Sequence, residues 1–179
     1  MIWESWYWKQ PLLKMAERLR DLKSPQTLSE EQLVQIEKDL FIGFYSVRKL
    51  FETGTKVTDS TKTKKVQITW YPNKKPVNWR NNHCIDELYA LDQQHGETRD
   101  LWFVSGRIIH SFIFAPVVED ETGGLVGIFF TSDTDKDKKL YFMDIDTVIH
   151  VFELVGHDDP TTIEWKRNPE TGEETTKLI

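Results

Sequence analysis

The spacing of apolar residues changes partway along this chain, and that change limits the folds it can adopt. Over residues 12–51 apolar residues recur about every 3.6 positions, which is the period of an α-helix. From residue 65 apolar and polar residues alternate, first at Val66, Ile68 and Trp70, and this is the period of a strand. Helices followed by strands predict an α+β fold.

The first part is expected to form a helical hairpin over residues 11–53. Pro11 suits the first turn of a helix, where its missing N–H needs no partner. The second helix should begin at Ser29, because serine followed three residues later by Gln32 is a capping box. Gly54 is placed to end it.

The second part, residues 65–156, is expected to supply a mainly antiparallel sheet of about four to five strands. After the strand that ends at Pro72, and a short helix near residue 85, the predicted strands are 101–104, 107–118, 125–131 and 139–143. Gly123 and Gly124 fit a hairpin turn. A late helix should follow, capped by Asp144 or Asp146, and should end at Gly156. We expect one domain over residues 1–167 and a polar tail, either frayed or a solvated hairpin, over 168–179.

Composition excludes several classes of protein. The chain is 39% apolar and 12% aromatic, which is too much for a disordered segment. The longest apolar runs fall well short of the about 18 residues of a membrane-spanning helix. The single cysteine, Cys84, excludes an internal disulfide, and residues 1–8 lack the features of a secretory signal, so we expect a cytoplasmic protein. No cofactor motif is visible, and none is expected.

Two histidines are candidates for a catalytic base. His83 precedes Asp86 and Glu87 by three and four residues, a spacing that would place them on one helical face, where a carboxylate could orient the imidazole. His110 lies in the most apolar stretch, where a strand would bury it with its neighbours in a pocket suited to a base. Both patterns also fit ordinary structural histidines, the interpretation we favour.

One acidic segment resembles a calcium-binding loop. Asp133, Asp135 and Asp137 alternate, and Asp144 follows eleven residues after the first. Lys138 stands where such a loop needs glycine, and the flanking segments resemble strands rather than helices. A charged hairpin tip is therefore the preferred interpretation, and no metal site is expected.

The segment 56–80 is basic, with a net charge of +6 in a chain whose total is −6. Cations interleaved with aromatic residues can bind single-stranded nucleic acid, although a net acidic chain argues against it. An edge strand protected by lysines, or a surface for an acidic protein, explains the pattern equally well. The binding candidates in and after this segment are Lys64, Lys65, Trp70, Lys74, Lys75, Trp79, Arg80 and Tyr89.

Three tryptophans fall within the first eight residues: Trp3, Trp6 and Trp8. Tryptophan is enriched at interfaces because it combines a large apolar surface with one hydrogen-bond donor. The segment should either cover its own domain or bind a second chain.

The sequence therefore favours a small non-catalytic binding protein whose partner is another protein or a second copy of itself. The alternatives are a hydrolase or lyase that uses His110 or His83 as its base, and a nucleic-acid-binding protein that uses the basic segment. No membrane partner is expected.

Overall fold

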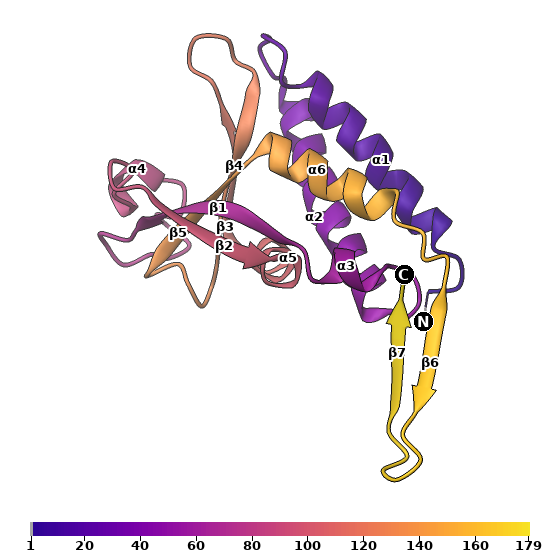
Figure 1. The fold of residues 1–179 in the computed structure, drawn as a ribbon. Coiled ribbons are helices and arrows are strands. Elements are labelled where there is room, and N and C mark those ends of the chain that lie inside the picture. Colours follow the sequence, from indigo (N-terminus) through magenta and orange to yellow (C-terminus); the bar gives the residue numbers. More distant parts are fainter. Residues whose placement is uncertain (1) are drawn as a thin grey trace.

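The structure is a computed structural model and describes residues 2–179 (Figure 1). Its helices are α1 (Trp6–Asp21), α2 (Glu30–Glu52), α3 (Asp59–Lys62), α4 (Ile85–Leu88), α5 (Leu101–Ile109) and α6 (Ile145–Gly156). Its strands are β1 (Lys65–Pro72), β2 (His95–Asp100), β3 (Ser111–Val118), β4 (Leu125–Ser132), β5 (Lys139–Asp144), β6 (Ile163–Arg167) and β7 (Glu174–Leu178).

The α+β prediction is confirmed. Five antiparallel strands form one sheet in the order β2-β1-β5-β4-β3, and β6 pairs with β7 in a separate hairpin. Helices α1, α2, α5 and α6 share the main apolar core with one face of the five-stranded sheet. A second, smaller core on the sheet joins residues of the segment 77–91, which carries α4, to strands β3 and β5.

The capping residues of two helices are confirmed by their contacts. The Ser29 side chain accepts a hydrogen bond from the Gln32 N–H, and the Gln32 side chain accepts one from the Ser29 N–H. The Asp144 carboxylate accepts from the Thr147 N–H at 2.7 Å and caps α6. The expected role of Pro11 is wrong, because α1 already begins at Trp6 and Pro11 lies inside it.

The strand predicted at residues 101–104 is also wrong, because this segment is the first part of helix α5. The Asp100 side chain caps this helix by accepting from the Phe103 N–H at 2.7 Å. Leu101, Val104 and Ile108 are fully buried at helical spacing. The predicted long strand from residue 107 is consequently shortened to β3, which begins at Ser111.

Strand β1 is not the edge strand that the sequence suggests. It pairs with β5 on one side and on the other with β2, a polar strand for which the sequence carries no apolar alternation. The two edges of the sheet are therefore β2 and β3, which differ in charge. β2 has the sequence HGETRD, whereas β3 has the sequence SFIFAPVV and carries no charged side chain.

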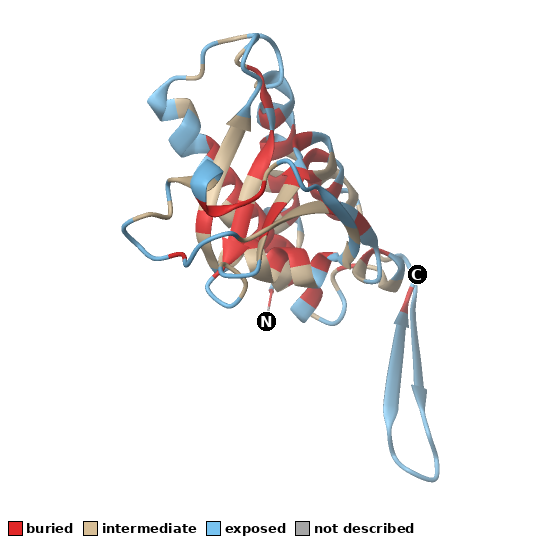
Figure 2. Ribbon diagram, turned by 90° about the vertical axis from the view of Figure 1, so that its left-hand side faces the viewer, coloured by how far each residue is buried: buried red, intermediate tan, exposed pale blue. Residues whose placement is uncertain are grey.

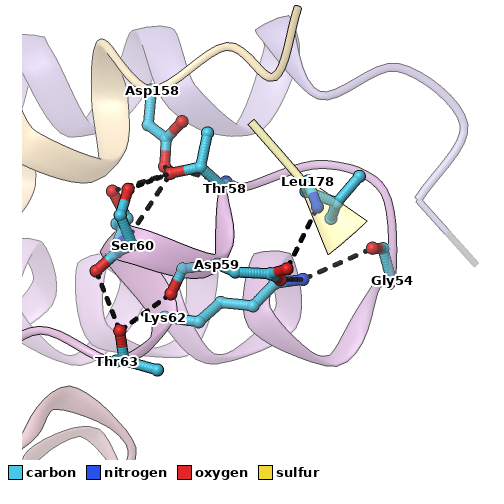
Figure 3. A network of polar contacts seen from close by, with 9 residues as sticks. Gly54, Thr58, Asp59, Ser60, Lys62, Thr63, Asp158 and Leu178 are labelled. Atoms are coloured by element: carbon cyan, nitrogen blue, oxygen red, sulfur yellow. Dashed lines mark hydrogen bonds and ion pairs between the residues drawn. The ribbon is translucent and has the colours of Figure 1, made fainter. Parts of the chain in front are cut away.

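The β6–β7 hairpin projects from the body as a thin arm (Figures 1 and 2). Every residue of β6 is exposed, and in β7 only Leu178 is buried. The base of the arm is held by α3, where the Asp59 carboxylate accepts from the Leu178 N–H at 3.0 Å (Figure 3). Beside it, the Asp158 carboxylate accepts from the backbone N–H and the hydroxyl of Thr58.

Candidate functional site

Exposed aromatic side chains, together with one isoleucine, lie in two segments: the first residues of the chain and the arm. In the first residues of the chain Trp3 is 95% exposed, Trp6 55% and Tyr7 76%; in the arm, Ile163 is 55% and Trp165 57% exposed. We call these five residues the aromatic end. Both segments lie toward the lower end of the body in Figure 1, and Figure 2 shows the chain start and the arm separated across the width of that end.

Polar contacts hold the chain start and the segment that leads into β6 against the body of the protein. The Lys9 ammonium, on α1 and only 1% exposed, forms an ion pair with Asp159 at 2.7 Å. Lys56 donates a hydrogen bond to the backbone oxygen of Trp3 at 3.2 Å. The start of α1 and the segment that leads into β6 are thereby tied to the same part of the body.

A shallow hollow of about 470 Å³ lies against the chain start. Trp8 lines it, and its ring centre is 6.4 Å from that of Tyr45 on α2. The Lys49 ammonium lies 5.8 Å from the centre of the Tyr45 ring, and its hydrogen bond lowers the pKa of the Glu52 carboxyl. Trp8 and Tyr45 are of the residue types enriched at protein interfaces, whereas the Lys49–Glu52 ion pair is of the types depleted there.

The expectation that His110 is buried on a strand is wrong. The residue is exposed and caps the C-terminal end of α5. Its neighbour Ser111 begins β3 and lines a groove of about 410 Å³, together with Asn82 and His83. The two candidate bases therefore do not share this groove, which has His83 alone among its lining histidines.

His83, Asp86 and Glu87 lie on or just before α4, and all three are exposed. Glu87 forms a long ion pair with Lys75 at 3.4 Å, and the backbone oxygen of Asp86 accepts from the Lys74 ammonium. Within residues 2–179 the structure places neither carboxylate in a hydrogen bond with the imidazole, so the oriented base is not assembled.

The four aspartates of the calcium-like pattern do not converge. Asp133 pairs with Lys136, Asp135 with Arg107, and Asp137 accepts from a backbone N–H. Asp144 lies at the far end of β5 as the cap of α6. In the described part of the chain no cluster of three or more histidine, cysteine or carboxylate side chains is placed to hold a metal ion.

The basic segment does not form one continuous surface. Lys64 and Lys65 lie at the start of β1, whereas Lys74 and Lys75 lie beyond its other end and contact the α4 segment. Trp70 is half-buried on β1; its ring stacks on the His95 imidazole at 4.3 Å, with the Lys139 ammonium 4.1 Å from its centre.

Two further binding candidates near this segment, Tyr89 and Trp79, differ in exposure. Tyr89 is fully buried, and its hydroxyl donates to the backbone oxygen of Lys136, so it is a structural residue rather than a contact residue. Trp79 is 73% exposed, and the Arg80 guanidinium lies 5.0 Å from the centre of its ring.

The sequence reasoning missed Ile163 and Trp165. Their signal was present, because both alternate with charged residues and precede a turn sequence, Asn168 to Gly172. In the hairpin the Cα partners of these two residues are Leu178 and Thr176, so the four side chains share one face.

Comparisons with known proteins add no functional assignment. No family model matches the chain, and neither a curated protein nor a solved structure matches it significantly. Across residues 2–179, no helix is both long enough and apolar enough to cross a membrane.

Proposed function

We propose that this chain is a non-catalytic binding protein that associates with a second copy of itself through the aromatic end. The observation that carries the proposal is the exposure of Trp3, Trp6, Tyr7, Ile163 and Trp165. Exposed aromatic surface of this kind is rare on an isolated domain unless it serves as an interface.

The arm supports this proposal because an isolated two-stranded hairpin is only marginally stable in water. The five-residue strands β6 and β7 bring Ile163 and Trp165 to one face, where Leu178 is buried at the base of the arm but Ile163 and Trp165 contact solvent. A second chain packed on this face would stabilise the hairpin and remove its apolar side chains from water.

A symmetric dimer accounts for both halves of the aromatic end. In a twofold arrangement the arm of each copy would cover the chain start of the other, so that each contact occurs twice. From Thr162 to Pro169 the arm is long enough, at about 3.3 Å per residue, to reach some 23 Å across a neighbour. The hollow beside Trp8 would receive part of that arm.

Sedimentation velocity over a range of protein concentrations tests the proposal. We expect a reversible dimer with a dissociation constant on the order of 1–10 µM. The variants W165S and W3S should each raise that constant by about 30-fold, because a buried interface tryptophan contributes about 2 kcal/mol or more. W79S is the matched control, since Trp79 is 73% exposed, a value between those of Trp165 and Trp3, but lies in the loop before α4.

Since W165S could unfold the arm itself, W3S keeps the test independent of hairpin stability. A strict monomer up to about 1 mM, or a dimer that W3S and W165S leave unchanged, would overturn the proposal. We further propose a cytoplasmic location, which the lone, half-buried thiol of Cys84 supports.

A further inference from the structure

The outer edge of β3 is a second, separate feature with the geometry of a binding site. β3 is the last strand of the sheet and pairs with β4. Its outer edge lines two adjoining grooves of about 410 and 440 Å³, which share Ala115, His83 and Ile85. Together they run along β3 from Ser111 to Val118.

The walls of these grooves come from opposite layers of the molecule. Glu37 and Phe41 of α2 form one wall, and the Phe41 ring centre lies 4.9 Å from that of Phe114 on β3. The segment Asn82–Glu87, around α4, forms the other wall. The floor between the walls is the unpaired edge of β3. A strand from another chain can pair with such an edge at a spacing of about 4.8 Å.

The two edges of the sheet differ in a way that singles out β3. On β2 the Glu97 carboxylate accepts hydrogen bonds from Arg99 and Lys139, so charged side chains guard that edge. β3 carries no charged side chain, and Pro116, which lacks an N–H, is its one residue of a type that hinders strand pairing. The Ser111 hydroxyl oxygen is buried in the groove floor and has no hydrogen-bond partner among residues 2–179.

The register shows which backbone groups face the grooves. Pro116 is the Cα partner of Ile128 and cannot donate a hydrogen bond to β4. Pro116 therefore fits a position whose backbone groups face away from β4. Backbone groups point to alternate sides along a strand, so the N–H and C=O of Phe114, two residues earlier, should also point outward, away from β4. Phe114 can therefore exchange two hydrogen bonds with an added strand.

The acidic side chains on the groove walls favour an added strand with basic residues. The charged side chains that line the grooves are the carboxylates of Glu37, Asp86 and Glu87, and among residues 2–179 only Glu87 has a basic partner, Lys75 at 3.4 Å. A second copy of β3 would bring the same carboxylates against these, and like charges oppose such pairing. A basic peptide would be attracted to both walls.

We infer that the β3 edge binds an extended, basic segment of a partner protein by strand addition between α2 and α4. The peptide backbone pairs with Phe114, and its lysine or arginine side chains reach Glu37 on one wall and Asp86 and Glu87 on the other. This site is independent of the aromatic end, and either proposal can fail without the other.

Fluorescence anisotropy with defined peptides tests the inference. The probe is a labelled eight-residue peptide in which valine alternates with lysine, and it should bind with a dissociation constant on the order of 10–100 µM. A peptide with glutamate in place of lysine should bind at least about tenfold more weakly. A lysine peptide methylated on every second backbone nitrogen should not bind, because it cannot pair with the strand.

Variants of the protein assign the site. E37K should weaken binding of the lysine peptide about fivefold, since it turns one attraction into repulsion. E17K makes the same charge change on the exposed surface of α1 and should leave binding unchanged. In NMR spectra of the complex, the amide proton of Phe114 should become protected from exchange with solvent.

Three outcomes would overturn the inference. The first is no binding of the lysine peptide at low ionic strength, and the second is equal binding of its methylated form. The third is protection of the Phe114 amide without peptide that grows with protein concentration, because the occupant would then be a second copy of the chain.

Discussion

Adding one methyl group at Gly43 should separate tight packing from helix propensity in this fold. Gly43 is buried on α2, and a Cβ atom built there would lie 2.3 Å from Cζ of Phe152 on α6. Carbon atoms need about 3.5 Å or more, so the Phe152 ring must move by over 1 Å. That ring is fully buried, and its centre lies 5.2 Å from that of Phe44.

The size of the effect follows from two opposing contributions. Overpacking a core costs about 1–3 kcal/mol, whereas alanine stabilises a helix by about 1 kcal/mol relative to glycine. G43A should therefore lower the free energy of unfolding by up to about 2 kcal/mol and the melting temperature by up to about 8 °C. Urea unfolding followed by far-ultraviolet circular dichroism measures this change.

G106A is the matched control on α5. Its nearest neighbour would be the guanidinium of Arg48 at 3.0 Å, the end of a side chain that can move aside. The helix preference for alanine should then dominate and raise the stability by about 0.5–1 kcal/mol. If G43A is as stable as G106A, the close packing of α2 on α6 is not as described.

Two further predictions concern single contacts. Burial raises the pKa of Glu97, but the hydrogen bonds from Arg99 and Lys139 outweigh it and lower the pKa below its usual 4.5. The ionised carboxylate therefore stabilises the fold above about pH 4.5, and this stabilisation is lost as the pH falls further. E97Q should be less stable than the native chain at pH 7. Urea unfolding should show the difference in stability between the two chains shrinking below about pH 4.5. D144A removes the cap that Thr147 donates to and should cost about 1 kcal/mol in thermal unfolding; an unchanged melting temperature would contradict the capping role.

Most helices could be predicted because local chemistry determines their ends. Ser29 with Gln32, and Asp144, satisfy backbone N–H groups within three residues, so no knowledge of the remaining chain is needed. Helix α5 shows the limit of this reasoning. Its cap, Asp100, and the spacing of Leu101, Val104 and Ile108 were visible, but β-branched and aromatic residues favoured a strand.

The wrong prediction of a strand at residues 101–104 also led to the wrong prediction for His110. With α5 continuing to Ile109, His110 becomes an exposed helix cap instead of a buried strand residue. Strand β2 was missed for a different reason, since its polar sequence pairs with β1 on one side and needs little apolar surface. Edge strands of this kind are specified by their partner and not by their own residues.

The candidate site could be predicted only in part. The density of aromatic residues at the chain start left open whether this segment covers its own domain or binds a second chain, and the structure leaves Trp3 and Trp6 exposed. The position of the arm relative to the chain start depends on contacts between residues far apart in sequence, such as Lys9 with Asp159 and Asp59 with Leu178. No periodicity in a single segment reports such contacts, and the grooves along β3 likewise require the final strand order.

Hydrogen–deuterium exchange of the arm at increasing protein concentration tests self-association most directly. In the monomer, the backbone amides of residues 163–178 should exchange fast, because nearly all of them belong to exposed residues of a marginally stable hairpin. If the arm packs on a second copy, these amides and those of the chain start should become protected as the concentration rises, and W3S should abolish that protection. Exchange of the arm that does not change with concentration would contradict the account.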